Sequence, residues 1–183
     1  MVFAFRTSAA VFWPATSLSL PAIPVCADGV NSKGTCMNHR PMDIALEEAR
    51  LAGARGEVPV GAVIVHKKDI IVRAGNRTRQ LNDVTAHAEI LAIREAARLL
   101  KAERLTGCDL FVTLEPCAMC AAAISFARIR RLYFGAEDNK GGGVVNGPRF
   151  YSQPTCHHAP EVYSGIAEQA AADLLTNFFR IKR

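Results

Sequence analysis

The sequence predicts an α/β domain in which a mixed sheet carries helices on both faces. Short apolar runs typical of strands alternate with longer amphipathic segments typical of helices, in the order α-β-β-α-β-α-β-α. The chain has 183 residues, of which 50% are hydrophobic and 21% charged, so it can bury a core without disulfides. No uninterrupted apolar run reaches about 18 residues, and we therefore expect no membrane-spanning helix and no membrane partner.

The first half of the predicted domain holds two helices and two strands. Apolar residues recur at helical spacing over 42–54, with charged residues between them, which predicts an amphipathic helix. The apolar runs 58–65 and 70–72 predict two adjacent strands. Residues 76–85 are polar and are expected to form a loop, and a helix is expected over 86–100.

The second half continues the alternation of strands and helices. The pattern predicts a strand over 109–114, an alanine-rich helix over 117–127 and another strand over 130–135. Three glycines at 141–143 indicate a loop. A last helix is expected over 165–180, and it completes the predicted order.

The six cysteines do not indicate a disulfide framework, because a domain of this size has enough core residues to fold without one. Cys117 and Cys120 form a C-x-x-C pair, whose spacing is typical of metal binding or redox chemistry in intracellular proteins. Cys108 lies beside a predicted strand and is expected to be a buried, inert thiol. Cys156 is expected in a surface loop.

Two short motifs carry the candidate chemistry. They are His87-Ala88-Glu89 at a helix start and Pro116-Cys117-Ala118-Met119-Cys120 where a strand meets a helix. Alone, the histidine could be a solvated capping residue and the cysteines a redox pair. Together the motifs supply one imidazole and two thiolates, a borderline-soft ligand set that suits zinc.

A set of three ligands, His87, Cys117 and Cys120, indicates a catalytic rather than a structural zinc site. Structural sites are closed by four protein ligands, whereas catalytic sites keep a position for water, whose pKa the metal lowers toward neutrality. Glu89 is the candidate for moving protons to and from that water. Residues two apart on a helix point roughly 200° away from each other, so His87 must lie at the helix cap for the motif to work.

Beyond these motifs, the sequence resembles the family of bacterial tRNA-specific adenosine deaminases. A His-x-Glu followed by Pro-Cys-x-x-Cys is the signature of zinc nucleobase deaminases. The resemblance covers about residues 38–183. The stretches that carry it are Glu57–Val63, Gly75-Asn76-Arg77, Thr85–Glu89, Thr113–Cys120 and Phe178-Phe179-Arg180.

The resemblance implies the cytidine-deaminase-like fold, a three-layer α/β/α sandwich, and a homodimer. It implies hydrolytic deamination of adenosine to inosine at the wobble position of tRNA, with the anticodon stem-loop as partner and the cytoplasm as location. One Zn²⁺ per subunit would be held by His87, Cys117 and Cys120. Glu89 would take a proton from water and deliver it to ring N1, and ammonia would leave from C6.

The resemblance also assigns contacts inside the substrate pocket. Asn76 is expected to hydrogen-bond the flipped adenine. Val58 and Leu114 are expected to form apolar walls. The backbone N–H groups of Ala88 and Cys117 are expected to face the charge that develops on the base.

Outside the pocket, the resemblance places Asp138 against the nucleotide that precedes the target. It places Phe178, Phe179 and Arg180 on a C-terminal helix that lines the RNA groove. The basic cluster at 128–131 also suits phosphate contacts, although a solvated surface explains any single arginine equally well. A net charge of +5 is too small to argue for RNA by itself, so binding must depend on where the arginines lie.

Two other functions stay open from the residues alone. A free-base deaminase acting on guanine or cytosine shares both zinc motifs, but Asn76 and the Phe178-Phe179-Arg180 tail disfavour it. A non-catalytic zinc-bound RNA-binding module belongs to a different class. The intact Glu89 and the missing fourth ligand disfavour that function.

The deaminase domain is expected to span residues 37–183, and residues 1–36 to lie outside it. Three explanations stand for this extension: a mis-assigned start with Met37 as the true first residue, a disordered tail, or a targeting peptide. We favour the first. A targeting peptide is disfavoured because export would separate the enzyme from its tRNA and because prolines interrupt the apolar stretch.

Overall fold

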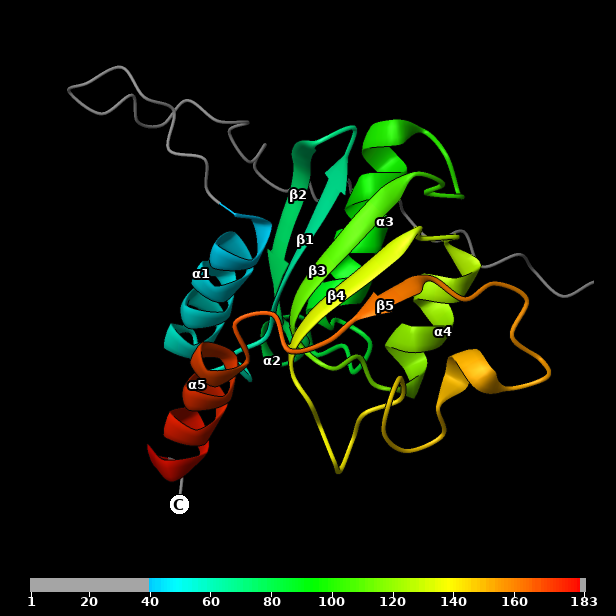
Figure 1. The fold of residues 1–183 in the computed structure, drawn as a ribbon. Helices are drawn as coiled ribbons and strands as arrows, with labels where there is room; N and C mark the ends of the chain where they lie inside the picture. The colour runs from blue at the N-terminus through cyan, green and yellow to red at the C-terminus, as the bar shows by residue number, and fades with distance from the viewer. Residues whose placement is uncertain (1–39, 182–183) are drawn as a thin grey trace, which may run out of the picture.

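The computed structural model describes residues 40–181 and confirms the α/β class (Figure 1). The extension predicted over 1–36 lies outside the described residues. In chain order the elements are α1 (Pro41–Ala54), β1 (Gly61–His66), β2 (Asp69–Gly75), α2 (Thr78–Leu81), α3 (Ala88–Leu100), β3 (Cys108–Leu114), α4 (Ala118–Phe126), β4 (Arg131–Ala136), the 3₁₀ turn η1 (Phe150–Ser152), β5 (Glu161–Tyr163) and α5 (Glu168–Ile181).

One five-stranded mixed sheet forms the middle layer, in the order β2-β1-β3-β4-β5. β1 pairs antiparallel with β2 and β3, whereas β3, β4 and β5 run parallel. Parallel neighbours need a crossover connection, and α4 supplies the one between β3 and β4. The C-terminal ends of β3 and β4 therefore lie side by side, with Leu114 opposite Ala136.

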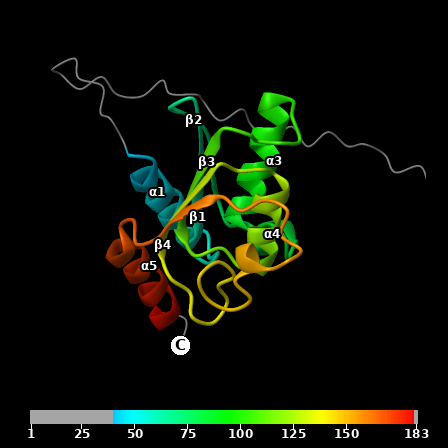
Figure 2. The same ribbon diagram turned by 45° about the vertical axis from the view of Figure 1, so that its right-hand side comes forward.

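Helices cover both faces of the sheet, which confirms the three-layer sandwich. α1 packs on β1, β2 and β3, and α5 packs on β4 and α1. α3 packs on β1 and β2 and contacts α4. Two views show α1 and α5 on one side of the sheet and α3 and α4 on the other (Figures 1 and 2).

The core follows the alternation of side chains along the strands. Ile64, Leu110 and Phe134 are fully buried in the larger cluster, which includes residues of α3 and α4, while Val63 and Val65 pack with residues of α1. Among the helices of residues 40–181, none combines the length and the apolar character needed to cross a lipid bilayer.

The differences from the predicted elements concern element ends and very short elements. β1 begins at Gly61, three residues late, because Pro59 has no N–H for a strand ladder. α5 begins at Glu168 rather than 165, because Gly165 and Ala167 have φ of +78° and +57°, outside the helical range. The unpredicted α2 and β5 are only four and three residues long, too short for a periodic apolar pattern.

Candidate active site

His87 lies at the N-terminus of α3. It is the N-cap residue, with extended backbone (φ −71°, ψ 152°), and Glu89 follows in the first helical turn. The preceding turn is held by Asp83, whose Oδ1 accepts hydrogen bonds from the N–H and the hydroxyl of Thr85 at 2.8 and 2.7 Å. The predicted cap position is confirmed, and it frees the imidazole from the helical periodicity that would separate it from Glu89.

The two cysteines lie at the N-terminus of α4, directly after β3. Cys117 is the N-cap residue (φ −67°, ψ 171°), and Cys120, one turn later, is fully buried. Pro116 precedes the cap, where its missing N–H leaves no helical hydrogen bond unmade. Because a helix N-terminus stabilises negative charge, this placement favours thiolates.

The fold brings His87, Cys117 and Cys120 together, so that their ligand atoms all lie within 4.8 Å of one another. The His87 Nδ1 atom is 3.5 Å from Cys120 Sγ and 3.8 Å from Cys117 Sγ. Tetrahedral zinc with ordinary bond lengths needs an N–S separation of about 3.6 Å. The donor set therefore fits zinc. Within residues 40–181, no other group of three His, Cys, Asp or Glu side chains comes this close.

The hydrogen bonds among the three ligands already favour negative charge on the sulfur of Cys117. The hydrogen bond with Cys120 lowers the pKa of Cys117 to about 4, although burial opposes this shift. The same bond, together with burial, raises the pKa of Cys120. The hydrogen bond with Cys117 also raises the pKa of His87. A divalent cation would replace these shared protons, since it binds the thiolate form of cysteine.

Glu89 is a buried carboxyl beside the predicted metal ligands. Only 3% of the residue is exposed, and burial raises the pKa of Glu89 above the usual value for glutamate. A carboxyl whose pKa is moved toward neutrality can both accept and return a proton at working pH. The proton-transfer role expected for Glu89 therefore suits its environment.

Asn76, at the end of β2, is also buried, with 6% of the residue exposed. Its Oδ1 accepts a hydrogen bond from the N–H of Ala88 at 2.8 Å. The resemblance assigns that N–H to the charge developing on the base, whereas in this structure it is donated to Asn76. The contact ties the end of β2 to the first turn of α3 and fixes which way the Asn76 amide faces.

The expected wall residues Val58 and Leu114 are half-buried, and both pack on the main core cluster. Asp138 is half-buried in the loop that follows β4. Its Oδ1 accepts the N–H groups of Lys140 and Gly141 at 3.0 and 2.9 Å, so one carboxylate oxygen already stabilises the turn. Only the second oxygen, Oδ2, is left to contact a substrate.

Phe178, Phe179 and Arg180 lie on α5, away from the metal ligands. α5 packs on the opposite face of the sheet from α3 and α4, so the fold does not bring these residues into the buried site. The two phenylalanine rings meet edge to face at 5.3 Å, and Phe179 is 50% exposed. The end of α5 and the loop after β4 lie at the same end of the molecule in both views (Figures 1 and 2).

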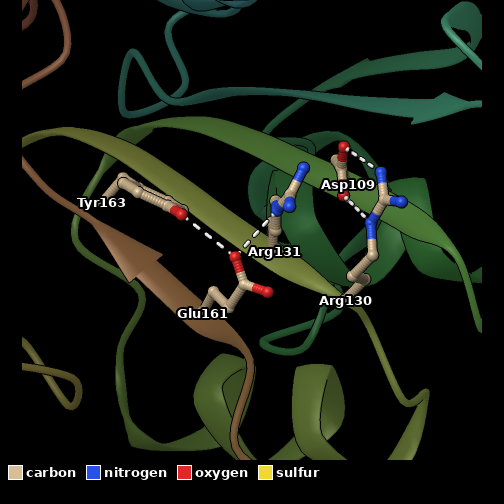
Figure 3. Close-up of polar contacts among 5 residues, drawn as sticks. All are labelled: Asp109, Arg130, Arg131, Glu161 and Tyr163. Atoms are coloured by element: carbon tan, nitrogen blue, oxygen red, sulfur yellow. Dashed lines mark hydrogen bonds and ion pairs between the residues drawn. The ribbon is translucent and has the colours of Figure 1, made fainter.

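The basic cluster before β4 is engaged in ion pairs and hydrogen bonds within the chain (Figure 3). Arg130 donates to both oxygens of Asp109, at 2.8 and 2.7 Å. Arg131 donates to Glu161 on β5 at 2.8 Å, and the hydroxyl of Tyr163 donates to the same carboxylate. Arg131 thus ties the edge strand β5 to β4, Arg130 is held against β3, and both charges are balanced by neighbouring carboxylates rather than left free for phosphate.

The remaining cysteines lie outside the metal cluster. Cys108 is fully buried at the start of β3, and burial raises the pKa of its thiol, as expected for an inert cysteine. Cys156 is half-buried between η1 and β5, where its Sγ donates to the carbonyl of His158 at 3.1 Å.

Two buried carboxylates were not identified from the sequence. Glu57 and Glu115 are 1% and 2% exposed; Glu57 accepts several hydrogen bonds from α2, and Glu115 accepts several from the loop after β4. The sequence does contain a signal, since each glutamate stands directly beside a buried apolar strand segment. That signal is weak, because exposed glutamates also stand at strand ends.

Comparisons with known proteins also identify this region as a zinc-binding deaminase domain. The family model for the cytidine and deoxycytidylate deaminase zinc-binding region matches residues 37–136. The tRNA-specific adenosine deaminase of Agrobacterium fabrum is 68% identical over 142 residues, covering 78% of this chain and 93% of that protein.

Two solved structures are similar to this chain. One comes from studies of A-to-I editing by tRNA:A34 deaminases at the wobble position of transfer RNA. It matches with a TM-score of 0.73 and 67% identity, covering 74% of this chain and 98% of that one. A guanine deaminase from Bacillus subtilis matches with a TM-score of 0.54 and 30% identity, covering 78% and 91%. The chain thus belongs to the cytidine and deoxycytidylate deaminase family and, within it, to the tRNA-specific adenosine deaminases.

Proposed function

We propose that this chain deaminates adenosine to inosine, by hydrolysis, at the wobble position of the tRNA anticodon. The observation that carries the proposal is the cluster of His87, Cys117 and Cys120 beside the buried Glu89, in a chain 68% identical to a tRNA-specific adenosine deaminase. Three protein ligands leave a fourth zinc position for water, as a hydrolytic site requires. The reaction exchanges the amino group at C6 of adenine for oxygen and releases ammonia.

Zinc held by His87, Cys117 and Cys120 would lower the pKa of a coordinated water toward neutrality. Glu89 would accept the proton of that water on its carboxylate and pass it to ring N1 of adenine. It would then take the second proton of the same water, from the new hydroxyl on C6, and pass it to the amino group, which leaves as ammonia when the C6–N bond breaks. Burial keeps bulk water away from this carboxyl, so the proton that it carries stays within the site.

The adenine would be held by Asn76 and by apolar walls. Because the Ala88 N–H occupies Oδ1 of Asn76, the Nδ2 amino group is the end left to donate to an acceptor atom of the base. Val58 and Leu114 would contact the faces of the ring. A base reaches such a pocket only when it is flipped out of its stack, which an anticodon loop permits at low cost.

The RNA around the target would meet the end of the molecule where α5 and the loop after β4 lie together. Asp138 would contact the preceding nucleotide through its free Oδ2. Phe178 and Phe179 would stack or pack against unpaired bases, and Arg180 would meet phosphate. An enzyme acting on tRNA is expected in the cytoplasm.

A homodimer is the expected assembly. Phe126, at the end of α4, is 70% exposed and borders a groove of about 490 Å³ that Ile93, Ala123 and His157 help to line. An exposed aromatic ring beside a partly apolar groove suits a self-complementary contact.

The decisive experiment incubates the zinc-loaded protein with an anticodon stem-loop that carries adenosine at the wobble position. Inosine is read as guanosine on sequencing, so an A-to-G change at that single position is the expected result. Free guanine is assayed in parallel, because a solved guanine deaminase shares the fold. Xanthine formation without any A-to-G change would refute the proposal in favour of a free-base deaminase.

A further inference from the structure

Glu115 stands between the end of β3 and the turn that carries Cys117, and its carboxylate lies beneath the loop after β4. Oε1 accepts the consecutive N–H groups of residues 144–146 at 3.0, 2.9 and 2.9 Å. Oε2 accepts the N–H of Asp138 at 3.0 Å and Nδ2 of Asn146 at 2.7 Å. Five donors from one loop therefore converge on a single buried side chain.

The same loop is packed directly on the turn that carries Cys117. The N–H of Gly143 donates to the carbonyl of Pro116 at 2.8 Å, and Gly142 forms an isolated bridge with Cys117. A Cβ on Gly142 would lie 2.5 Å from Cδ of Glu115, and one on Gly143 would lie 2.6 Å from the backbone N of the first residue of α4. No side chain fits at either position, so the loop has little freedom to shift.

We propose that Glu115 is a positioning residue, which holds the loop 138–146 in one arrangement against the Cys117 turn and thereby places Asp138 at the substrate site. This inference rests on the function proposed above. The loop has little regular secondary structure, so its N–H groups need another acceptor, and the Glu115 carboxylate supplies it. Glu115 itself lies beneath the loop and acts through Asp138 rather than on the base.

A glutamine at this position is not a conservative replacement. It has one carbonyl oxygen and one amino group, whereas the loop directs donors at both carboxylate oxygens of Glu115. The glutamine amino group would take the place of either Oε1 or Oε2 and would face N–H groups of the loop. Those buried donors would then have no acceptor, which is costly. Glu115→Gln should therefore loosen the loop while keeping almost the same volume.

The test compares Glu115→Gln with Glu47→Gln, a change of an exposed glutamate on α1. Deamination of the stem-loop should show KM raised at least about 10-fold in Glu115→Gln, with kcat changed less than about 3-fold. Zinc content should be unchanged. Amide hydrogen exchange should accelerate over 138–146 but not in α3, and Glu47→Gln should match the wild type in every measurement.

A double-mutant cycle tests whether Glu115 acts through Asp138. Glu115→Gln made in an Asp138→Ala background should raise KM less than about 3-fold further. Full additivity of the two changes would overturn the proposal. So would a Glu115→Gln variant with normal KM and normal exchange over 138–146, or one with lowered kcat alone.

If Glu115→Gln does not fold, Asn146→Ala decides the question, because it removes one donor to Oε2. Raised KM with faster exchange over 138–146 would support the anchoring role, and no change in either would overturn it. Failure of the wild type to form inosine would instead refute the proposed function, and the exchange comparison would still report on the anchoring.

Discussion

The metal site and the C-terminal helix are held by the fold in opposite ways. The ligands His87, Cys117 and Cys120 stand at the starts of two helices and converge within 4.8 Å, beside a carboxyl that is 97% buried. In α5, by contrast, Ala171 is the only residue that is buried among those described, and Phe179 is half exposed.

This difference is consistent with the proposed division of work, in which the metal site performs the chemistry and α5 contacts the RNA. Proton transfer and metal binding need groups held within a fraction of an ångström, and packing in a core supplies that precision. Contact with a large RNA needs exposed aromatic and basic groups, which contribute little to the fold before RNA binds. Substitutions should therefore separate the two regions by whether they change catalysis, stability or RNA binding.

The largest effect is expected at the metal site. Glu89→Ala should lower kcat on the stem-loop at least about 10³-fold, because the other buried carboxyl near the ligands, Glu115, already accepts hydrogen bonds from the loop after β4 on both oxygens. Zinc content should stay at one per subunit, since His87, Cys117 and Cys120 are unchanged. Glu47→Ala is the matched control, and undiminished inosine formation by Glu89→Ala would contradict the mechanism.

A substitution in the core beneath the site should lower the free energy of unfolding. Phe134 on β4 is fully buried, so Phe134→Ala should lower the free energy of unfolding by about 3–5 kcal/mol, measured by urea denaturation. A loss below about 1 kcal/mol would show that the cluster beneath α3 and α4 is less tightly packed than the structure indicates.

A substitution on the exposed helix α5 should change RNA binding rather than the stability of the fold. Phe179→Ala should change the free energy of unfolding by less than about 1 kcal/mol, because half of the side chain already contacts water. Its KM for the stem-loop should rise about 5-fold or more, because the loss of one stacked base costs about 1–3 kcal/mol, with kcat retained. A normal KM would show that Phe179 on α5 does not contact the RNA. A large loss of stability would show that the Phe179 side chain packs in the core.

The smallest effect concerns Glu57, and it is a stability difference near neutral pH that disappears in acid. Burial alone would raise the pKa of Glu57, but hydrogen bonds from the N–H groups of Gln80 and Arg79 and the hydroxyl of Thr78 outweigh it and lower the pKa. A carboxylate whose pKa is lowered on folding stabilises the fold above its ordinary value of 4.5, and that stability is lost as pH falls through the folded value.

Glu57→Gln should therefore be less stable than the wild type at pH 6, and the gap should shrink as pH falls below about 4.5. Unfolding at several pH values measures the gap directly. Loss of zinc in acid affects both proteins and so cancels from the difference. A gap that stays constant with pH would show that Glu57 contributes by shape rather than by charge.

The zinc ligands were predictable because each motif acts over one turn of helix. The cap positions of His87 and Cys117 and the shared face of Cys117 and Cys120 depend on backbone geometry over a few residues. The roles of Glu57 and Glu115 were not predictable, because their hydrogen-bond donors lie more than twenty residues along the chain. The same holds for Arg130, whose partner Asp109 is twenty-one residues away.

Local periodicity in the chain was enough to establish the α/β class and the order of the long elements, and two short motifs were enough to establish the zinc chemistry. Four features became visible only in the folded chain: the strand order, the short edge strand β5, the contact between Asn76 and Ala88, and the anchoring of the Asp138 loop. The reason is physical. Helix and strand periods arise from dihedral angles repeated within a segment, whereas the surroundings of a single polar side chain are made by segments that meet only when the core closes.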